Sequence, residues 1–189
     1  MEKATNIMKA AWLFPDILFL HGERGNIMAL ERMASLAGID LEVEKIDFQT
    51  SDFEPMDYGI IFCPPGEITS FETVIDKLRP YYDKLREFIE SGRVILATGT
   101  GCCIFGNDVK REDGSVIKGL GLIDCSFEER KYVYGDDICF TENYSKDNEE
   151  CFGVQIQMTD MISQSVKSFG TLIYGFGNTG KDRNEGVIK

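Results

Sequence analysis

The sequence predicts an α/β fold with a parallel central sheet and smaller mixed or antiparallel strands in its second half. Up to residue 106, short apolar runs alternate with amphipathic stretches of helical period, which is typical of right-handed β-α-β crossovers. After Gly106 the expected strands are short and are separated by polar turns. No internal repeat or linker divides the 189 residues, so we expect one domain over residues 1–189.

Four strands are expected in the first half, at residues 10–14, 41–46, 58–63 and 94–97. Asn26 is expected to cap a helix over residues 27–37, which ends at Gly38. Ser70 can cap the next helical stretch. Pro80 either kinks that helix or separates two helices, because proline removes an internal hydrogen bond.

The sequence of the second half predicts a hairpin over residues 110–116, with its turn at Asp113 and Gly114. Further short strands are expected at residues 120–125, 132–134, 138–141, 153–158 and 171–174. Glycine is dense after residue 170, which predicts loops around one strand near the end of the sequence.

The segment over residues 95–106 is the feature around which the chain is organised. An apolar run, residues 94–97, stops at Thr-Gly-Thr-Gly and then turns apolar again. This pattern predicts a central parallel strand, a tight turn with positive φ at Gly99, and a short helix. Enzymes use such an elbow to expose a nucleophile, and the amides of the first helical turn favour an anion there.

The composition restricts the classes of function. A net charge of −12 argues against nucleic-acid binding, since no basic patch is present to neutralise phosphates. Six cysteines without CxxC spacing and a single histidine, His21, give no reason to expect a metal or a cofactor. The sequence has no signal peptide and no apolar run of membrane-spanning length. We therefore expect no membrane span, a cytoplasmic location and reduced thiols.

Three stretches resemble one protein family. Residues 96–106 are similar to the elbow of class I glutamine amidotransferases, Leu-Ala-x-Cys-Gly-Gly-x-Gln-x-x-Gly. Residues 15–18 and 22–27 resemble Tyr-Pro-x-Leu and Gly-Asp-Arg-Gly-Asn-Ile, which open the CobB/CobQ-like amidotransferases. Residues 175–187 are similar to the Gly-x-Gly-Asn-Asn-Gly and Glu-Gly-Val segment of the same group. This group forms the glutaminase subunit of lipid II isoglutaminyl synthase, and three ordered motifs are far more specific than one.

The resemblance implies a flavodoxin-like class I glutamine amidotransferase fold, with a site where the strands over residues 58–63 and 94–97 end. It also implies a Mur-ligase-like protein partner, a role in peptidoglycan precursor amidation or a related pathway, and glutamine as a candidate ligand. On this pattern the opening motif contributes Arg24 and Asn26. The residues expected to line the pocket are Gly66, Glu67, Gly99, Thr100, Gly101, Cys103 and Gln157.

The chain departs from the family pattern at each catalytic element. Gly99 falls on the position of the nucleophilic cysteine. Pro64 and Pro65 replace two residues of a Gly-Gly-Gly loop whose amides help to bind the oxyanion, so two donors are lost. The family's catalytic histidine would follow residue 187, and the 189 residues contain no counterpart. These departures predict a degenerate relative without glutaminase activity.

Two other functions remain open. Cys102 lies in the first helical turn, where a helix N-terminus can lower a thiol pKa, and it could be the displaced nucleophile of a working hydrolase. Residues 99–101 could instead bind phosphate or a nucleotide, although they lack the lysine of a P-loop.

Several residues have both a structural and a functional interpretation. His21 is either a loop residue or a base, and Cys103 is either a small buried side chain or a reactive thiol. Arg24 and Asn26 could cap a helix, bind a carboxylate ligand or contact a partner. Glu67 is either a pocket residue or a solvated loop acid.

Overall fold

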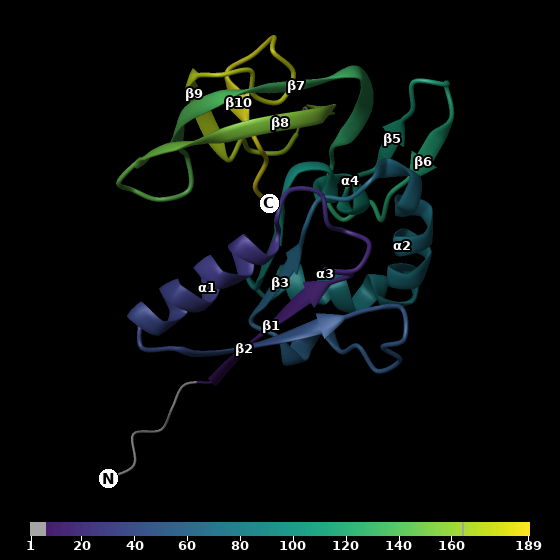
Figure 1. Ribbon diagram of the computed structural model, residues 1–189, viewed down its shortest axis with the longest axis vertical. Helices are drawn as coiled ribbons and strands as arrows, with labels where there is room; N and C mark the ends of the chain where they lie inside the picture. The colour runs from purple at the N-terminus through teal and green to yellow at the C-terminus, as the bar shows by residue number, and fades with distance from the viewer. Residues whose placement is uncertain (1–6, 164) are drawn as a thin grey trace. The chain divides into compact units, whose positions relative to one another are not determined.

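The computed structural model describes residues 7–163 and 165–189 (Figure 1). The chain forms two compact units, which divide between Cys102 and Cys103. Each unit contains its own β-sheet, and each is described separately below. The expectation of one domain over residues 1–189 stays a prediction.

The first unit contains a four-stranded parallel sheet in the order β2-β1-β3-β4. In this sheet Trp12 pairs with Lys45 on one side and with Phe62 on the other, and Phe62 pairs with Leu96. Because all four strands run in the same direction, their carboxyl ends lie along one edge, where open α/β sheets place their sites. The strands are β1 (Ile7–Leu13), β2 (Asp40–Ile46), β3 (Ile60–Cys63) and β4 (Val94–Ala97).

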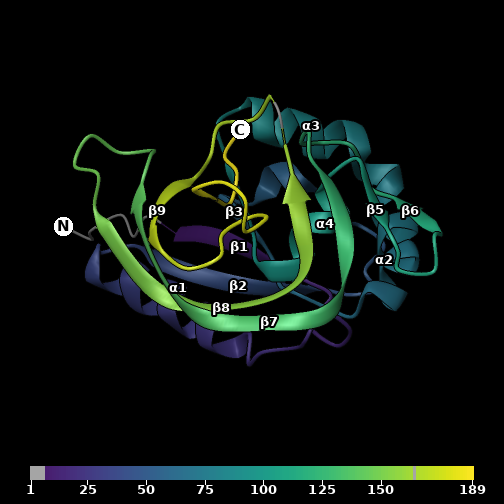
Figure 2. The same ribbon diagram turned by 90° about the horizontal axis from the view of Figure 1, so that it is seen from above.

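Helices cover both faces of this sheet (Figure 2). Helix α1 (Arg24–Leu36) connects β1 to β2, and α2 (Phe71–Leu78) and α3 (Tyr82–Glu90) connect β3 to β4. The connection from β1 to β2 and the connection from β3 to β4 run in opposite directions across the sheet. Because both connections are expected to be right-handed, α1 lies on one face of the sheet, and α2 and α3 lie on the other. A short 3-10 helix, Arg79–Tyr81, lies between α2 and α3, so Pro80 separates two helices.

The core between α1 and the sheet is built from alternating strand residues. Trp12 and Phe62 project from the same face and form a buried cluster with Ile27 of α1, against which Leu30 and Val43 also pack. Burial of such large apolar side chains stabilises the fold by about 1.5–3 kcal/mol each. The predicted parallel α/β architecture of the first half is therefore confirmed.

Two expectations about the first unit were wrong. Within the described residues β4 pairs with β3 alone and is an edge strand, and Val94 and Leu96 are 52% and 38% exposed. An apolar run indicates side chains suited to burial, but it does not determine whether another strand pairs on the open side. Asn26 does not cap α1, because the helix already begins at Arg24 and the N-cap position belongs to Glu23.

The second unit contains a six-stranded mixed sheet in the order β10-β9-β7-β5-β6, with β8 paired to β7. Strand β5 is parallel to β7 and the other pairs are antiparallel, which confirms the mixed character expected of the second half. The strands are β5 (Asp108–Lys110), β6 (Val116–Lys118), β7 (Ser126–Glu142), β8 (Glu150–Ile162), β9 (Gly170–Tyr174) and β10 (Asn184–Glu185).

The strand boundaries in this unit differ from the expectation. The segments over residues 132–134 and 138–141 belong to one long strand, β7, whose pairing with β8 shifts register between Glu129 and Tyr134. Polar residues in this strand mark its exposed side and its bulge, and they do not interrupt it. Residues 120–125 form no strand. The hairpin of β5 and β6 is confirmed, with Gly114 at positive φ in its turn.

A buried carboxylate closes the hairpin formed by β7 and β8. Glu142 is only 1% exposed. Its carboxylate accepts hydrogen bonds from the Ser145 hydroxyl and from the amides of Ser145 (2.8 Å), Tyr144 (2.7 Å) and Glu149 (3.1 Å). These bonds, led by that of the Ser145 hydroxyl, lower the pKa of Glu142 to about 2, because they stabilise the ionised form.

We predict that Glu142→Gln destabilises the protein at neutral pH and reduces the loss of stability in acid. The folded-state pKa lies below the ordinary value of 4.5, so the carboxylate contributes fully above that pH. Its contribution decreases as the pH falls toward about 2. Thermal melts followed by circular dichroism between about pH 7 and pH 3 measure this difference. Glu150→Gln, an exposed acid of the same hairpin, is the control. If the melting temperatures of wild type and Glu142→Gln fall in parallel as the pH is lowered, the Glu142 carboxylate does not make this contribution to stability.

Candidate functional site

The elbow follows β4 at the carboxyl edge of the parallel sheet. Residues Gly99–Gly101 form a 3-10 turn that continues into the short helix α4 (Cys102–Phe105). Gly99 has a φ of +50°, in the left-handed region that favours glycine, and it is exposed. The Thr98 amide donates to the Cys63 carbonyl oxygen at 3.1 Å and ties the start of the elbow to the end of β3. The predicted tight turn and positive φ are confirmed.

The loop after β3 packs directly against the elbow. A Cβ atom at position 101 would lie 2.6 Å from the Pro64 carbonyl oxygen and 2.8 Å from that of Cys63, so only glycine fits there. A Cβ atom at position 99 would lie 3.2 Å from Cβ of Pro65, closer than an ordinary van der Waals contact. Any side chain at the nucleophile position therefore meets the ring of Pro65.

Thr100 engages the one backbone donor that the loop retains. Its side chain is buried, and Oγ1 accepts a hydrogen bond from the Gly66 amide at 3.1 Å while donating to the Gly66 carbonyl oxygen at 2.8 Å. Pro64 and Pro65 have no N–H group. In the loop over residues 64–66, each backbone donor is therefore either missing or already bonded. An oxyanion hole requires preorganised donors aimed at the developing charge, and this loop presents none.

The side chains of the two cysteines after the elbow both contact oxygen atoms. Sγ of Cys102, a half-buried residue, donates to the Ala97 carbonyl oxygen at 3.1 Å. A hydrogen bond donated by a thiol stabilises its neutral form and opposes ionisation. Cys103 is buried, and its Sγ lies 3.8 Å from Oγ1 of Thr159. The structure therefore favours the packing interpretation for Cys103, and it places the Cys102 thiol in a hydrogen bond to the end of β4.

Glu67 and Ser70 form a turn at the start of the crossover from β3. The Glu67 carbonyl oxygen accepts hydrogen bonds from the Ser70 hydroxyl at 2.7 Å and the Ser70 amide at 2.9 Å. The Glu67 carboxylate is exposed and reaches the Thr69 hydroxyl at 3.5 Å. Ser70 precedes α2 but makes no side-chain cap bond. Glu67 therefore lies in a turn beside the elbow, with its carboxylate in solvent.

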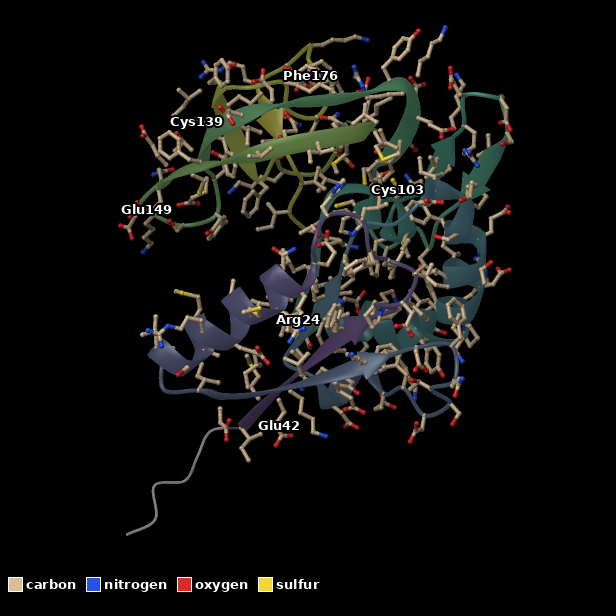
Figure 3. All side chains as sticks on the ribbon, in the orientation of Figure 1. Arg24, Glu42, Cys103, Cys139, Glu149 and Phe176 are labelled. Carbon is tan, nitrogen blue, oxygen red and sulfur yellow. The ribbon has the colours of Figure 1, made fainter. Side chains whose placement is uncertain are left out.

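The opening motif is organised by Glu23, which the sequence analysis did not single out. Glu23 is buried, and its carboxylate accepts hydrogen bonds from the His21 amide at 3.2 Å and the Asn26 side-chain amide at 2.8 Å. The Asn26 side chain therefore binds the Glu23 carboxylate. Arg24 is exposed at the first position of α1 (Figure 3). The three-residue spacing between Glu23 and Asn26 beside glycines was the available signal.

In the second unit, residues 175–187, which we call the closing motif, form a loop that is held by hydrogen bonds within itself. The Asn178 side chain accepts a hydrogen bond from the Gly186 amide at 2.8 Å and donates to the Gly186 carbonyl oxygen at 3.1 Å. The side-chain amide of Gln157 donates to the Asn178 carbonyl oxygen at 2.9 Å and to Asp160 at 3.3 Å. Gln157 therefore has its partners within this unit, and its role as a pocket residue stays a prediction.

Arg130 completes this network and was also missed from the sequence, where it lies within a run of charged residues. It forms an ion pair with Asp160 at 2.5 Å, and its guanidinium lies 4.5 Å from the ring centre of Phe176. A cavity of about 70 Å³ beside the closing motif has room for a few water molecules. Its lining includes Ser163, Ser168 and Asn178.

Residues 7–163 and 165–189 contain no metal-binding constellation. No group of three or more His, Cys, Asp or Glu side chains in these ranges could hold a metal ion. Within the same ranges no helix is long and apolar enough to cross a membrane.

The sequence of this chain is similar to those of known proteins. The family model of the CobB/CobQ-like glutamine amidotransferase domain matches residues 10–189. The chain is 24% identical over 184 residues to the lipid II isoglutaminyl synthase (glutamine-hydrolyzing) subunit GatD of Streptococcus pneumoniae, covering 95% of this chain and 69% of that protein. It is 26% identical over 175 residues to the subunit of the same name from Staphylococcus aureus, covering 91% and 69%.

A solved crystal structure of a glutamine amidotransferase has the same fold. It aligns with a TM-score of 0.53 and 16% sequence identity, covering 86% of this chain and 79% of the other. A family match that runs through both units, from residue 10 to residue 189, means that this chain belongs to the CobB/CobQ-like glutamine amidotransferases.

Proposed function

We propose that this protein is a degenerate glutamine amidotransferase-like subunit that lacks glutaminase activity. It acts with a Mur-ligase-like partner in peptidoglycan precursor amidation or a related pathway. The observation that carries the proposal is the closed loop beside the elbow. Between Pro64 and Gly66 two backbone donors are missing, and the third is bonded to Thr100 Oγ1 at 3.1 Å.

The chemistry of the family explains why these features matter together. Hydrolysis of glutamine through a cysteine requires a thiolate at the elbow, a base that generates it and amides that hold the oxyanion. Position 99 is glycine, and Pro65 lies where a side chain at that position would project. Losing one oxyanion donor alone costs about a hundred- to a thousandfold in rate. The combined losses support a protein that keeps the fold without the reaction.

The proposed partner follows from the relatives. Both GatD proteins are named as subunits of a glutamine-hydrolyzing lipid II isoglutaminyl synthase, so they act as parts of a larger enzyme. A chain that matches them over more than nine-tenths of its own length can occupy the same position in a complex. Glutamine is the candidate small-molecule ligand of such a complex.

The two alternative functions find less support. A displaced nucleophile at Cys102 is opposed by the hydrogen bond from its thiol to the Ala97 carbonyl oxygen. A phosphate site at residues 99–101 is opposed by the bonds that the turn already makes. The Gly101 amide donates to Thr98, the Cys102 amide donates to Gly99 and Thr100, and the Thr100 hydroxyl bonds to Gly66.

We predict that the purified protein releases no glutamate from glutamine and that Gly99→Cys does not create the activity. The new thiol would contact Pro65, and the loop over residues 64–66 would offer no free amide to the oxyanion, because two donors are absent and the third is bonded to Thr100. When several groups act together in one reaction, restoring one of them recovers little of the activity. A coupled glutamate assay, with a working glutaminase as positive control, measures both proteins. Turnover by the wild type that disappears in Cys102→Ala would establish the displaced nucleophile.

A second prediction concerns the bond that closes the loop. Thr100→Ala leaves the buried amide and carbonyl of Gly66 without this partner and is expected to destabilise the protein by about 1–3 kcal/mol. Thr100→Ser keeps the hydroxyl and should retain most of that stability. Chemical denaturation of the two variants provides the comparison. Equal losses for Ala and Ser would mean that the methyl group, and not the hydroxyl, holds the loop.

A further inference from the structure

Helix α1 has a second apolar face that does not contact the sheet. The residues that pack on the sheet are Ile27, Leu30 and Ala34. Two other rows of residues four apart lie side by side on the outer surface of the helix, one with Met28, Arg32 and Leu36 and the other with Gly25, Ala29 and Met33. We call these two rows the outer face of α1.

The apolar side chains of this outer face are strongly exposed. Met28, Met33 and Leu36 are 58%, 64% and 63% exposed. Among residues 7–102 of the first unit, α2 and α3 cover the face of the sheet opposite α1 (Figure 2). Three such side chains on one helix surface form a patch of the kind that marks a protein–protein contact. Methionine is well suited to this role because its flexible side chain adapts to a partner surface.

Gly25 on the outer face is a glycine that the fold does not require. Its backbone is not in the positive-φ region, and a Cβ atom built on it would have no atom within 4 Å. Gly25 is the second residue of α1, and a side chain at this position would meet no other atom of the chain. Gly25 and Ala29 form a row of small residues beside Met28 and Leu36. Small side chains allow a second helix to approach closely.

The charges on this surface also lack partners in the described residues. Arg24 and Arg32 are exposed, and within residues 7–163 and 165–189 neither forms an ion pair. Arg24 is at the first position of α1, where the helix dipole disfavours a cation. In a chain with a net charge of −12, two arginines beside an apolar stripe give this face a local charge opposite to that of the molecule.

We infer that the outer face of α1 binds a helix of the partner subunit, whose apolar side chains pack on the small residues Gly25 and Ala29 and whose carboxylates meet Arg24 and Arg32. This inference rests on the proposed function, which requires a partner. A second copy of this chain fits less well. Self-pairing would present the same two arginines and no acid, because the rows of the outer face contain no aspartate or glutamate.

The test uses the full chain and the purified Mur-ligase-like protein from the same genome, with binding measured by biolayer interferometry. Gly25→Leu adds a bulky side chain to the row of small residues, and Arg32→Glu reverses a charge. Thr73→Leu and Arg79→Glu are the controls, because both residues are exposed near α2 on the opposite side of the sheet. Arg79, unlike Arg32, forms an ion pair, with Asp76 at 3.7 Å, so the thermal melt of Arg79→Glu is compared with its binding. Thermal melts of each variant separate binding effects from folding effects.

We expect wild-type binding that Gly25→Leu weakens about tenfold or more, while its melting midpoint stays close to that of wild type, because a side chain at position 25 would meet no other atom of the chain. Arg32→Glu should weaken binding and reduce its dependence on salt, and the two controls should bind like wild type.

Two results would contradict the inference in different ways. Wild-type binding that survives both Gly25→Leu and Arg32→Glu would overturn the α1 interface and leave the proposed function intact. Absence of wild-type binding would overturn the proposed partnership and the interface with it. Sedimentation of the isolated chain as a dimer that Gly25→Leu dissociates would identify a second copy as the occupant, against the inference.

Discussion

The reciprocal hydrogen bonds between the Thr100 hydroxyl and the Gly66 backbone determine the character of the whole site. They join the two loops that leave β3 and β4, across a sequence separation of 34 residues. With these loops fixed, Gly101 can approach the Pro64 carbonyl oxygen, and Pro65 comes to lie against Gly99. The same bonds engage the last amide of the loop. One interaction therefore both stabilises the elbow and removes the donor that an oxyanion would need.

The turn of the elbow does not depend on a cysteine at position 99. The family's nucleophile position requires a backbone conformation that costs about 1–3 kcal/mol for most residues. Glycine adopts it freely, and Gly99 retains the turn at a φ of +50°. Neither the parallel sheet nor the Asn178 clamp on Gly186 depends on a thiol at position 99. Family membership therefore does not by itself establish catalytic activity, because function belongs to the site and not to the fold.

Much of the fold could be predicted from the sequence, because it depends on local patterns. The apolar runs and helical periods predicted the parallel strands and their crossovers, and Gly-Thr-Gly predicted the turn at Gly99. Features set by distant partners could not be predicted. Nothing in residues 94–97 indicates that β4 lies at an edge, and the partner of Thr100 is in a loop of another crossover. Glu23 and Arg130 were missed because burial and ring contacts depend on the folded arrangement.

The most direct test of the account is covalent labelling with a diazoketone analogue of glutamine, followed by intact-mass and peptide mass spectrometry. This reagent alkylates a thiolate that is held beside a glutamine pocket and supported by oxyanion donors. The account predicts no adduct on this protein under conditions that label a working glutaminase completely, because position 99 is glycine and the loop donors are missing or engaged. A stoichiometric adduct mapped to Cys102 would contradict the account and show that the elbow carries an active nucleophile.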